Sequence, residues 1–359
     1  MGKMVESDHL SLFAGRRVVV TGDTGFKGSW LALWLSMCGA EVLGYALPPK
    51  RDNDHYNLIG LKGVIRHVDG DVRDFEGMRK VFSDFDPEIV FHLAAQALVR
   101  LSYEEPKNTF DTNVGGFVNV LEVARCLPKL RSVICVTSDK CYLNKEWTWG
   151  YRESDELGGR DPYSASKAAA EMVFFGYMQA FFKDREDVGI GSVRAGNVIG
   201  GGDWSEDRIV PDSIKALQRG EPIFLRNPSS TRPWQHVLEP LSGYMLLAAK
   251  LHASPKAYSG SWNFGPDRNA VNTVRDLAER IISHWGDGRI ETAVGSEGPY
   301  ESKLLHLNCD KAFYSLDWHP RWDFERTVAE TTVWYRDVWR GQPALPKTRE
   351  QITAYMGGE

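Results

Sequence analysis

The sequence has few cysteines, and they are not arranged to bind zinc or to form a disulfide framework. The 359 residues include five cysteines, an odd number, and no two of them form a CxxC pair. This usage fits a reducing compartment. No apolar run approaches the ~20 residues that a membrane-spanning helix needs, and the stretch up to Leu12 lacks a signal-peptide core. We therefore expect a cytoplasmic protein with no metal site and no membrane partner.

An excess of basic residues is also missing. Lys and Arg number 43 against 48 Asp and Glu, which gives a net charge of −5. A nucleic-acid partner would require a basic surface, so none is expected. The 34 glycines have no fixed period, which excludes collagen, and the 42% of hydrophobic residues excludes wholesale disorder. The length suggests about two domains.

What the sequence does contain is a regular alternation of short β-branched runs and helical patterns. The alternation predicts an α/β fold with a doubly wound parallel sheet. After residue 195 glycine, proline and tryptophan cluster, and shorter helical patterns at 209–218, 274–284 and 324–339 predict a smaller α/β region. The first part has predicted strands at 17–20, 41–47, 64–68, 88–93, 132–137 and 190–193, and predicted helices at 30–37, 75–85, 109–125 and 162–182.

A glycine-rich loop links the first predicted strand to the first predicted helix. Its glycines follow the spacing G-x-x-G-x-x-G over residues 22–28. Such glycines permit a tight turn and close backbone approach to a pyrophosphate, while the helix N-terminus supplies donors. Lys27 is unusual there, because a small or apolar residue would pack better. The loop predicts a dinucleotide site, with candidate cofactor residues Gly22, Thr24, Gly25, Phe26, Lys27 and Gly28.

The second predicted strand lacks the acidic residue that usually follows it and binds the ribose hydroxyls of NAD. Residues 46–51 read Ala-Leu-Pro-Pro-Lys-Arg, and the first acid is Asp52. Lys50 and Arg51 either receive the 2′-phosphate of NADP or belong to a solvated loop, and the residues alone leave both readings open. An NAD bound here would lack the acid's contact with its ribose hydroxyls, and we would then expect weaker retention than in proteins that have the acid.

Candidate catalytic residues follow the fifth predicted strand. Tyr163 and Lys167 share a helix face at i, i+4, and a nearby ammonium favours the phenolate, so the pair can take a proton from a sugar hydroxyl as hydride leaves the same carbon. Ser138, at the carboxyl end of the strand, faces the ligand crevice and is placed to bind the same hydroxyl. Asp139 and Lys140 form an acid/base couple beside it, or else a surface ion pair.

Several stretches resemble the extended short-chain dehydrogenase/reductase family of nucleotide-sugar enzymes, over nearly the whole chain. They are residues 21–28, 92–96 (His-Leu-Ala-Ala-Gln), 113–115 (Asn-Val-Gly) and the Tyr163…Lys167 pair. Three further stretches, at 137–142, 196–204 and 231–237, resemble the family members that dehydrate CDP-glucose.

The resemblance implies a Rossmann-like fold, NAD as the cofactor and CDP-glucose as the substrate. The implied reaction is a lyase cycle: oxidation at C4, loss of water across C5–C6, and return of the hydride to C6. Tyr163, aided by Ser138 and Lys167, would serve C4. Lys140, which stands where related dTDP-glucose enzymes have Glu, would be the C5 base, and Asp139 the acid for the 6-hydroxyl. A 4-epimerase has no use for this couple, and a nucleotide sensor would not need the catalytic tyrosine and lysine.

The resemblance also implies binding residues and domains. An NAD-binding domain would consist of residues 14–195, and the chain would rejoin it at about 236–265. A nucleotide-sugar-binding domain would consist of residues 196–235 and 266–345. Further expected cofactor contacts, besides Tyr163 and Lys167, are Asp71, Val72, Leu93, Ala94, Ala95, Gln96 and Thr112. The expected substrate contacts are Asn197, Trp204, Arg208, Arg232 and Tyr300.

A homodimer is implied as well, with a homotetramer as the alternative, through the helices at 109–125 and 162–182. Apolar residues on these helices either face outward for pairing or pack in the core, and the pattern leaves both open for Phe117, Val120, Phe174, Phe175 and Met178. Among the tryptophans, Trp204 and Trp234 fall in the stretches that resemble the CDP-glucose enzymes. Helical apolar patterns place four others in the core, namely Trp30, Trp34, Trp285 and Trp334.

Overall fold

The computed structural model describes residues 8–267, 271–292 and 304–357. Its centre is a seven-stranded sheet in the order β11-β6-β5-β4-β1-β2-β3, and each of its strand pairs is parallel. The doubly wound parallel sheet predicted from the sequence is therefore confirmed. The third strand begins two residues later than predicted, and the last was not predicted. The strands are β1 (Arg17–Thr21), β2 (Glu41–Ala46), β3 (Arg66–Asp69), β4 (Ile89–His92), β5 (Ser132–Val136), β6 (Gly189–Arg194) and β11 (Gly260–Asn263).

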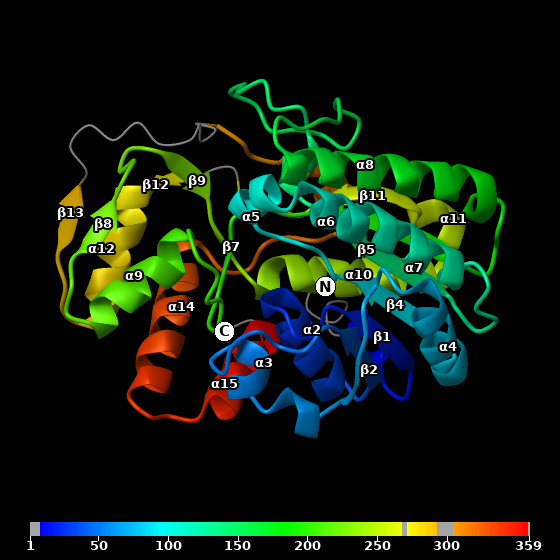
Figure 1. Ribbon diagram of the computed structural model, residues 1–359, viewed down its shortest axis with the longest axis horizontal. Helices are drawn as coiled ribbons and strands as arrows, with labels where there is room; N and C mark the ends of the chain where they lie inside the picture. The colour runs from blue at the N-terminus through cyan, green and yellow to red at the C-terminus, as the bar shows by residue number, and fades with distance from the viewer. Residues whose placement is uncertain (1–7, 268–270, 293–303, 358–359) are drawn as a thin grey trace, which may run out of the picture.

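Helices cover both faces of this sheet (Figure 1). Along β1, Val18 and Val20 enter one core and Val19 enters the other, as the alternation of side chains in a strand requires. The first core includes residues of α2 (Phe26–Met37) and α10 (Leu238–Ala253). The second includes residues of α4 (Phe75–Phe85), α7 (Gly116–Ala124) and α8 (Pro162–Tyr177).

The helix expected over 109–125 is interrupted. It consists of α6 (Pro106–Phe110), a π-helical turn η2 (Asp111–Gly115) and α7, while α8 continues into a second π-helical turn, η4 (Met178–Phe182). Of the two readings of the apolar residues on these helices, core packing is correct for Phe117, Val120 and Phe174. Phe175, in contrast, is 60% exposed.

Several segments after β6 form a group of small sheets and helices toward the left of Figure 1, whereas α10 lies along the large sheet. The pairs β7–β10 and β8–β13 are parallel, and β9–β12 is antiparallel. A capping box of Thr273 and Asp276 begins α12. The elements are β7 (Val198–Ile199), α9 (Ile209–Gln218), β8 (Ile223–Leu225), β9 (Thr231–Pro233), β10 (Gln235–His236), β12 (Val271–Thr273), α12 (Val274–Trp285), β13 (Ile290–Thr292) and α14 (Phe324–Trp339).

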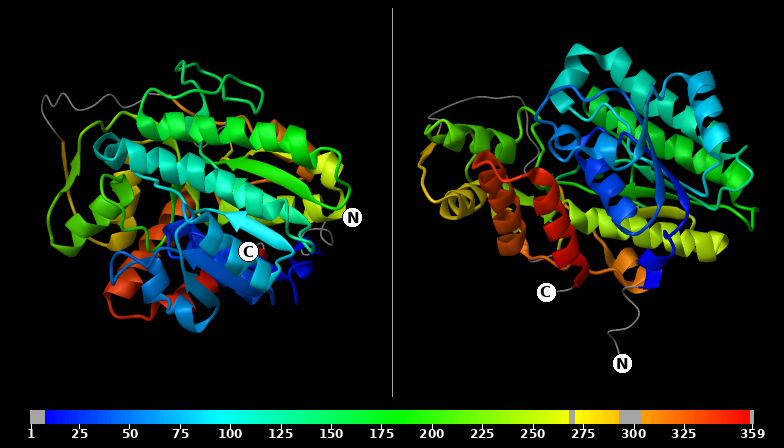
Figure 2. Two further views of the ribbon diagram at one scale, coloured as in Figure 1. Left: turned by 45° about the vertical axis from the view of Figure 1, so that its right-hand side comes forward. Right: turned by 90° about the horizontal axis from the view of Figure 1, so that it is seen from below.

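The C-terminal helix α15 (Ala344–Gly357) returns to the first half of the chain, as both views in Figure 2 show. Tyr355 packs edge-to-face on Trp34, with ring centroids 5.6 Å apart, and Thr348 Oγ1 lies 3.2 Å from His55 Nε2. The four tryptophans expected in the core are buried there. The remaining elements are α1 (Asp8–Ser11), α3 (His55–Leu58), η1 (Leu61–Gly63), α5 (Val99–Glu104), η3 (Asp139–Cys141), α11 (Pro255–Tyr258) and α13 (Asp310–Leu316).

Within the described ranges, no helix combines the length and apolar character that a bilayer crossing requires. The same residues contain no cluster of His, Cys, Asp and Glu side chains that could hold a metal ion. All five cysteines are free thiols.

Candidate active site

The glycine loop lies directly against the end of β4. Gly22 has φ +76°, and a Cβ there would lie 2.7 Å from the backbone nitrogen of Ala94. A Cβ on Gly28 would lie 2.0 Å from the carbonyl oxygen of Gly22. Only glycine fits at either position. Gly25 is the exposed N-cap of α2 and has no side chain to cap the helix, so the helix N-terminus can offer its N–H groups to an anion.

The end of β4 is tied to this loop and, further on, to α8. Leu93 and Ala94 donate their backbone N–H groups to Thr21 Oγ1, at 3.1 and 3.2 Å. The backbone N–H of Gln96 donates to Asn113 Oδ1 at 2.8 Å, and Asn113 Nδ2 donates to Ser166 Oγ at 2.9 Å. Asn113 belongs to the Asn-Val-Gly stretch, but the sequence gave no reason to assign it this connecting role. The half-buried Ala95 lies within the same segment.

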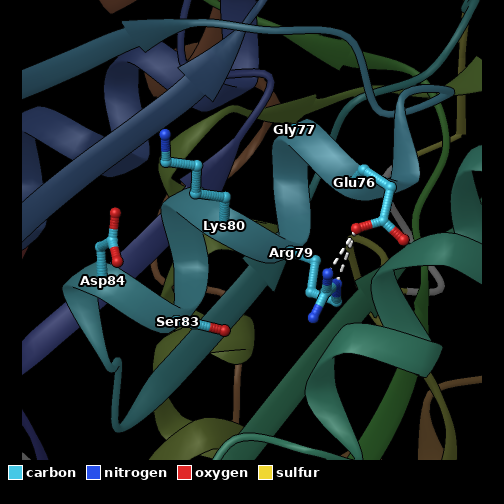
Figure 3. Close-up of a pocket in the computed structure, with 6 residues that line it drawn as sticks. All are labelled: Glu76, Gly77, Arg79, Lys80, Ser83 and Asp84. Atoms are coloured by element: carbon cyan, nitrogen blue, oxygen red, sulfur yellow. Dashed lines mark hydrogen bonds and ion pairs between the residues drawn. The ribbon is translucent and has the colours of Figure 1, made fainter.

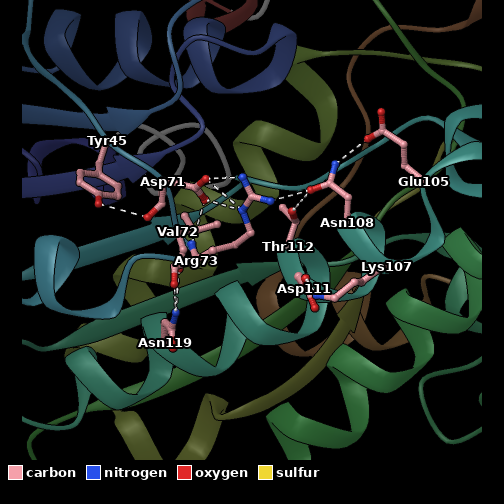
Figure 4. A network of polar contacts seen from close by, with 10 residues as sticks. All are labelled: Tyr45, Asp71, Val72, Arg73, Glu105, Lys107, Asn108, Asp111, Thr112 and Asn119. Atoms are coloured by element: carbon pink, nitrogen blue, oxygen red, sulfur yellow. Dashed lines mark hydrogen bonds and ion pairs between the residues drawn. The ribbon is translucent and has the colours of Figure 1, made fainter.

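Three of the expected cofactor contacts gather around an arginine (Figure 4). Arg73 donates from Nε to both carboxylate oxygens of Asp71, at 2.9 and 3.0 Å, and from Nη1 to Asn108 Oδ1 at 2.7 Å. Thr112 Oγ1 is 3.5 Å from the same Asn108 oxygen, and Val72 follows Asp71 directly. Hydrogen bonds from Arg73 lower the pKa of Asp71. The structure therefore brings Asp71, Val72 and Thr112 together. The connecting residues, Arg73 and Asn108, were missed by the sequence analysis.

In the loop after β2, the basic residues are anchored by their neighbours. Arg51 forms an exposed ion pair with Glu206 at 3.3 Å, and the backbone N–H groups of Lys50 and Arg51 both donate to Asp54 Oδ2. The glycine loop contacts the start of this segment, because Thr24 Oγ1 donates to the Leu47 carbonyl at 2.9 Å. In the structure the guanidinium of Arg51 is thus already paired with a carboxylate.

The short helix η3 follows the carboxyl end of β5. Its N-cap is Ser138, and it begins with Asp139 and Lys140. Ser138 Oγ donates to Asp139 Oδ1 at 2.9 Å and accepts from the Lys140 backbone N–H at 3.2 Å. Asp139 is only 3% exposed, which excludes the reading of a surface ion pair. Its Oδ2 lies against Gly196, where a Cβ would be 2.0 Å away. Lys140 is half-buried.

Tyr163 and Lys167 lie in the first turns of α8, whose N-cap Asp161 accepts from the backbone N–H of Ser164. Burial raises the pKa of Tyr163 to about 12, although hydrogen bonding to Ser138 acts to lower it. Burial also lowers the pKa of Lys167 to about 8. The sequence analysis expected the ammonium to favour the phenolate. In the structure burial is the largest influence on both pKa values, because a low-dielectric surrounding disfavours the charged form of each group.

Two further cations lie near this pair. Arg208 Nη1 pairs with Asp203 Oδ2 at 2.8 Å, and its charge acts to lower the pKa of Tyr163. Lys27, expected only as part of the glycine loop, extends into the same centre. Burial, together with repulsion from Arg208 and Lys167, lowers the pKa of Lys27 to about 8.

The expected substrate residues are more dispersed. Asn197 has φ +51° and lines a small recess together with Asp139 and Gly196. Trp204 is buried edge-to-face on Tyr335, with ring centroids 5.1 Å apart. Arg232, in β9, is half-buried, and Tyr300 lies outside the described residues. Trp234 is buried against Phe324.

A separate recess lies on the exposed surface of α4 (Figure 3). An i, i+3 ion pair of Arg79 and Glu76 borders it. None of the expected site residues lines this recess, whose lining consists of Glu76, Gly77, Arg79, Lys80, Ser83 and Asp84.

The doubly wound sheet, the glycine loop after β1 and the Tyr163–Lys167 pair beside β5 define a protein of the short-chain dehydrogenase/reductase class. The family model described as GDP-mannose 4,6 dehydratase matches residues 19–331, and the chain belongs to that family.

Relatives and solved structures agree with this placement. The chain is 45% identical over 350 residues to a CDP-glucose 4,6-dehydratase of Salmonella typhimurium, covering 96% of this chain and 98% of that protein. It is 31% identical to UDP-glucuronate 4-epimerase 4 of Arabidopsis thaliana, covering 91% and 77%. The fold matches the structure of a dTDP-glucose 4,6-dehydratase from Bacillus anthracis in complex with NAD, with a TM-score of 0.74, 22% identity and coverage of 92% and 100%.

Proposed function

We propose that this protein is an NAD-dependent lyase that converts CDP-glucose to CDP-4-keto-6-deoxyglucose. The observation that carries the proposal is the 45% identity, over 96% of the chain, to a protein described as a CDP-glucose 4,6-dehydratase. The reaction type is supported independently by the residues that follow β5. A buried acid, Asp139, and a lysine, Lys140, stand beside the Ser138–Tyr163–Lys167 group.

The residues at the carboxyl end of the sheet fit a bound NAD. Gly22 permits the tight turn of the loop against the end of β4, and Gly28 permits the close approach of α2 to that turn; a side chain at either position would collide with backbone atoms and disturb the loop that faces the pyrophosphate. The glycine loop, including Thr24, Phe26 and Lys27, would hold the phosphates, and Asp71, Val72 and Thr112 would hold the adenosine end. Residues 93–96 would line the path between the two. When bound, NAD would accept a hydride from C4 of the sugar and return one to C6.

At C4, Tyr163 would take the proton of the sugar hydroxyl. Ser138 would hold that hydroxyl in line, and its hydrogen bond acts to lower the pKa of Tyr163. The ammonium of Lys167 would stabilise the phenolate that burial otherwise disfavours. The protein thus supplies the base, its orientation and its counter-charge.

At C5 and C6, Lys140 would remove the proton that the 4-keto group acidifies, and Asp139 would protonate the departing 6-hydroxyl, which leaves as water. Lys140 would then return a proton to C5 as C6 receives the hydride. Asp139 is held by Ser138 and by the close approach of Gly196. We assign the nucleotide-sugar contacts to Asn197, Trp204, Arg208, Arg232 and Tyr300. The guanidinium of an arginine suits a diphosphate.

The alternative is a 4-epimerase, since the chain is also similar to a UDP-glucuronate 4-epimerase. An epimerase returns the hydride to C4 and has no need of an acid and a base for elimination. Incubation with NAD and, separately, CDP-, dTDP-, UDP- and GDP-glucose, followed by NMR, distinguishes the two. We expect a 4-keto-6-deoxy sugar from CDP-glucose. A 4-epimer without loss of water, or a preference for dTDP-glucose, would refute the assignment.

We further infer a homodimer through the outward face of α8, and a cytoplasmic location, where nucleotide-sugars and NAD are available. Met172, Phe175 and Phe181 leave a large apolar area on α8 and η4, being 67%, 60% and 48% exposed. The proposal also includes the two domains, an NAD-binding domain of residues 14–195 rejoined by about 236–265, and a nucleotide-sugar-binding domain of residues 196–235 and 266–345. Light scattering on the purified protein tests the dimer.

A further inference from the structure

Lys167 and a second charged residue of α8 both contact the end of β5. Lys167 Nζ donates to the Val136 carbonyl at 3.5 Å. Glu171 lies one helical turn further along the same face and accepts a hydrogen bond from Thr137, the residue after Val136. The ammonium and the carboxylate are therefore neighbours on the inner side of the helix.

Glu171 is held in place by a buried arginine. Arg194, at the end of β6, donates from Nε and Nη2 to the two carboxylate oxygens of Glu171, at 2.9 and 2.7 Å. The side chain of Glu171 is 1% exposed and that of Arg194 is 2% exposed. Ser192 Oγ donates a further hydrogen bond to the Glu171 carboxylate at 2.9 Å. Burial acts to raise the pKa of Glu171, but Arg194 and these hydrogen bonds bring it below its ordinary value. Glu171 therefore remains ionised although it is buried.

The other groups that face Lys167 do not offer it a negative charge. Cys141, in η3, acts with Glu171 to raise the pKa of Lys167, but burial raises the pKa of the thiol itself well above its ordinary value, so the thiol is neutral where Glu171 is already ionised. Burial lowers the pKa of His92, in β4, to about 3, so its imidazole is neutral too. Lys27 of α2 adds repulsion. In the part of the chain that the structure describes, Glu171 is thus the ionised carboxylate that acts on Lys167.

We propose that Glu171 is a positioning residue that keeps Lys167 protonated while Tyr163 acts as base, and that Arg194 fixes Glu171 for this purpose. The inference rests on the proposed roles of Tyr163 and Lys167. Burial alone would favour loss of the Lys167 proton, and an uncharged amine could not stabilise a phenolate. The ionised carboxylate one turn away opposes that loss.

The proposal has a specific consequence for the pH profile. The reactive form of the pair has lost the Tyr163 proton and kept the Lys167 proton. At low pH, the amount of this form depends on the pKa of Tyr163 alone. At higher pH the pair loses one proton from either group, and loss from Lys167 is unproductive. A lower Lys167 pKa therefore leaves the acidic part of the profile unchanged, but the rate levels off at a lower pH and at a lower value.

The test is the pH dependence of NADH formation in the first turnover with CDP-glucose, followed by ultraviolet absorbance. We expect Glu171→Gln to match wild type at the acidic end and to level off about tenfold lower, which corresponds to a pKa decrease of about one unit for Lys167. The single variant leaves Arg194 buried without a partner and could fail to fold. The double variant Glu171→Gln/Arg194→Gln removes both charges. We expect its rate, too, to match wild type at the acidic end and to level off at a lower value.

Two controls accompany these variants. Glu171→Asp keeps the charge and should retain the wild-type profile shape. Glu239→Gln removes another buried carboxylate, on α10, which contacts Tyr355 and the backbone of Arg321 and Trp322, and it should leave the profile unchanged.

An equal loss of rate at every pH would show a purely structural role for Glu171, and an unchanged profile would show no role. Either result overturns the inference. If wild type gives no 4-keto-6-deoxy product from CDP-glucose, as followed by NMR, the proposed function itself fails, and the two failures are thereby distinguished.

Discussion

Substitution of Gly196 by alanine should uncouple elimination from oxidation. A Cβ at this position would lie 2.0 Å from Oδ2 of Asp139 and 2.4 Å from its Cγ. Cβ atoms in proteins essentially never approach other heavy atoms within 3.0 Å, so one of the two groups must move. Asp139 is the more mobile partner, because it is a side chain and Gly196 is backbone. It would have to leave its position beside Ser138 by about 1 Å, a displacement that can cost about 10²-fold in rate.

The assay follows both half-reactions in the same sample. The three atoms nearest to a Cβ on Gly196 all belong to Asp139, so we expect C4 oxidation by Tyr163 and Lys167 to be slowed much less than elimination. Protonation of the 6-hydroxyl by Asp139 should slow about 10²-fold, and NADH should accumulate during the first turnover. Ultraviolet absorbance reports the NADH, and NMR reports the final 4-keto-6-deoxy product.

The double variant Gly196→Ala/Asp139→Ala tests whether the effect passes through Asp139. With the carboxylate gone, the added methyl group has nothing to displace, so the double variant should be no slower than Asp139→Ala alone. Full additivity of the two losses would refute the reasoning. Gly63→Ala is the matched control, since a Cβ there meets nothing within 4 Å and the φ angle is not in the left-handed region.

Two other outcomes are expected. Lys140→Ala should block removal of the C5 proton while leaving C4 oxidation intact, so that NADH is trapped; dehydration at the normal rate would exclude the assigned role. Burial raises the pKa of Glu239 from 4.5 to about 7, and such a group contributes stability that is present below its unfolded pKa and lost as pH rises through the folded one. Between pH 4.5 and about 7, wild type should therefore lose stability relative to Glu239→Gln. Parallel melting temperatures of the two proteins across that range would contradict this prediction.

Much of the fold could be predicted from sequence because the strands are buried on both faces. Runs such as Val18-Val19-Val20 are apolar without interruption, as parallel strands require. The strand β11 (Gly260–Asn263) could not be predicted in this way, because it contains a glycine, a serine and an asparagine. Asn263 is nevertheless fully buried and donates to the carbonyl groups of Tyr151 and Asn308. Its place in the sheet depends on partners far away in the chain.

The break in the helix at η2 was also invisible to a periodicity argument. A π-helical turn adds one residue to a turn and leaves the apolar pattern on either side intact. The turn contains Asn113, whose side chain joins residues 96 and 166. The composition of this segment predicted one long helix. The hydrogen bonds of Asn113 to residues 96 and 166, which the π-helical turn makes possible, form only in the folded chain.

Within the site, local motifs predicted which residue types gather at the end of the sheet, but not their electrostatic balance. Tyr163 and Lys167 were paired by spacing alone, and spacing cannot show that burial raises one pKa and lowers the other. The carboxylate that opposes this, Glu171, lies outside every motif considered. Its role depends on Arg194, 23 residues away on another strand.

Lys27 shows how position in a helix decides what a side chain reaches. Among the loop glycines a lysine looked poorly suited to packing. It is the second residue of α2, however, and helical side chains tilt towards the N-terminus. That N-terminus follows the carboxyl end of β1, where the ligand crevice of a doubly wound sheet lies. Lys27 is therefore directed to the crevice, where it joins Lys167 and Arg208 near the carboxylates of Asp139 and Asp203. Positive charge exceeds negative charge among these side chains, which suits a substrate that carries a diphosphate.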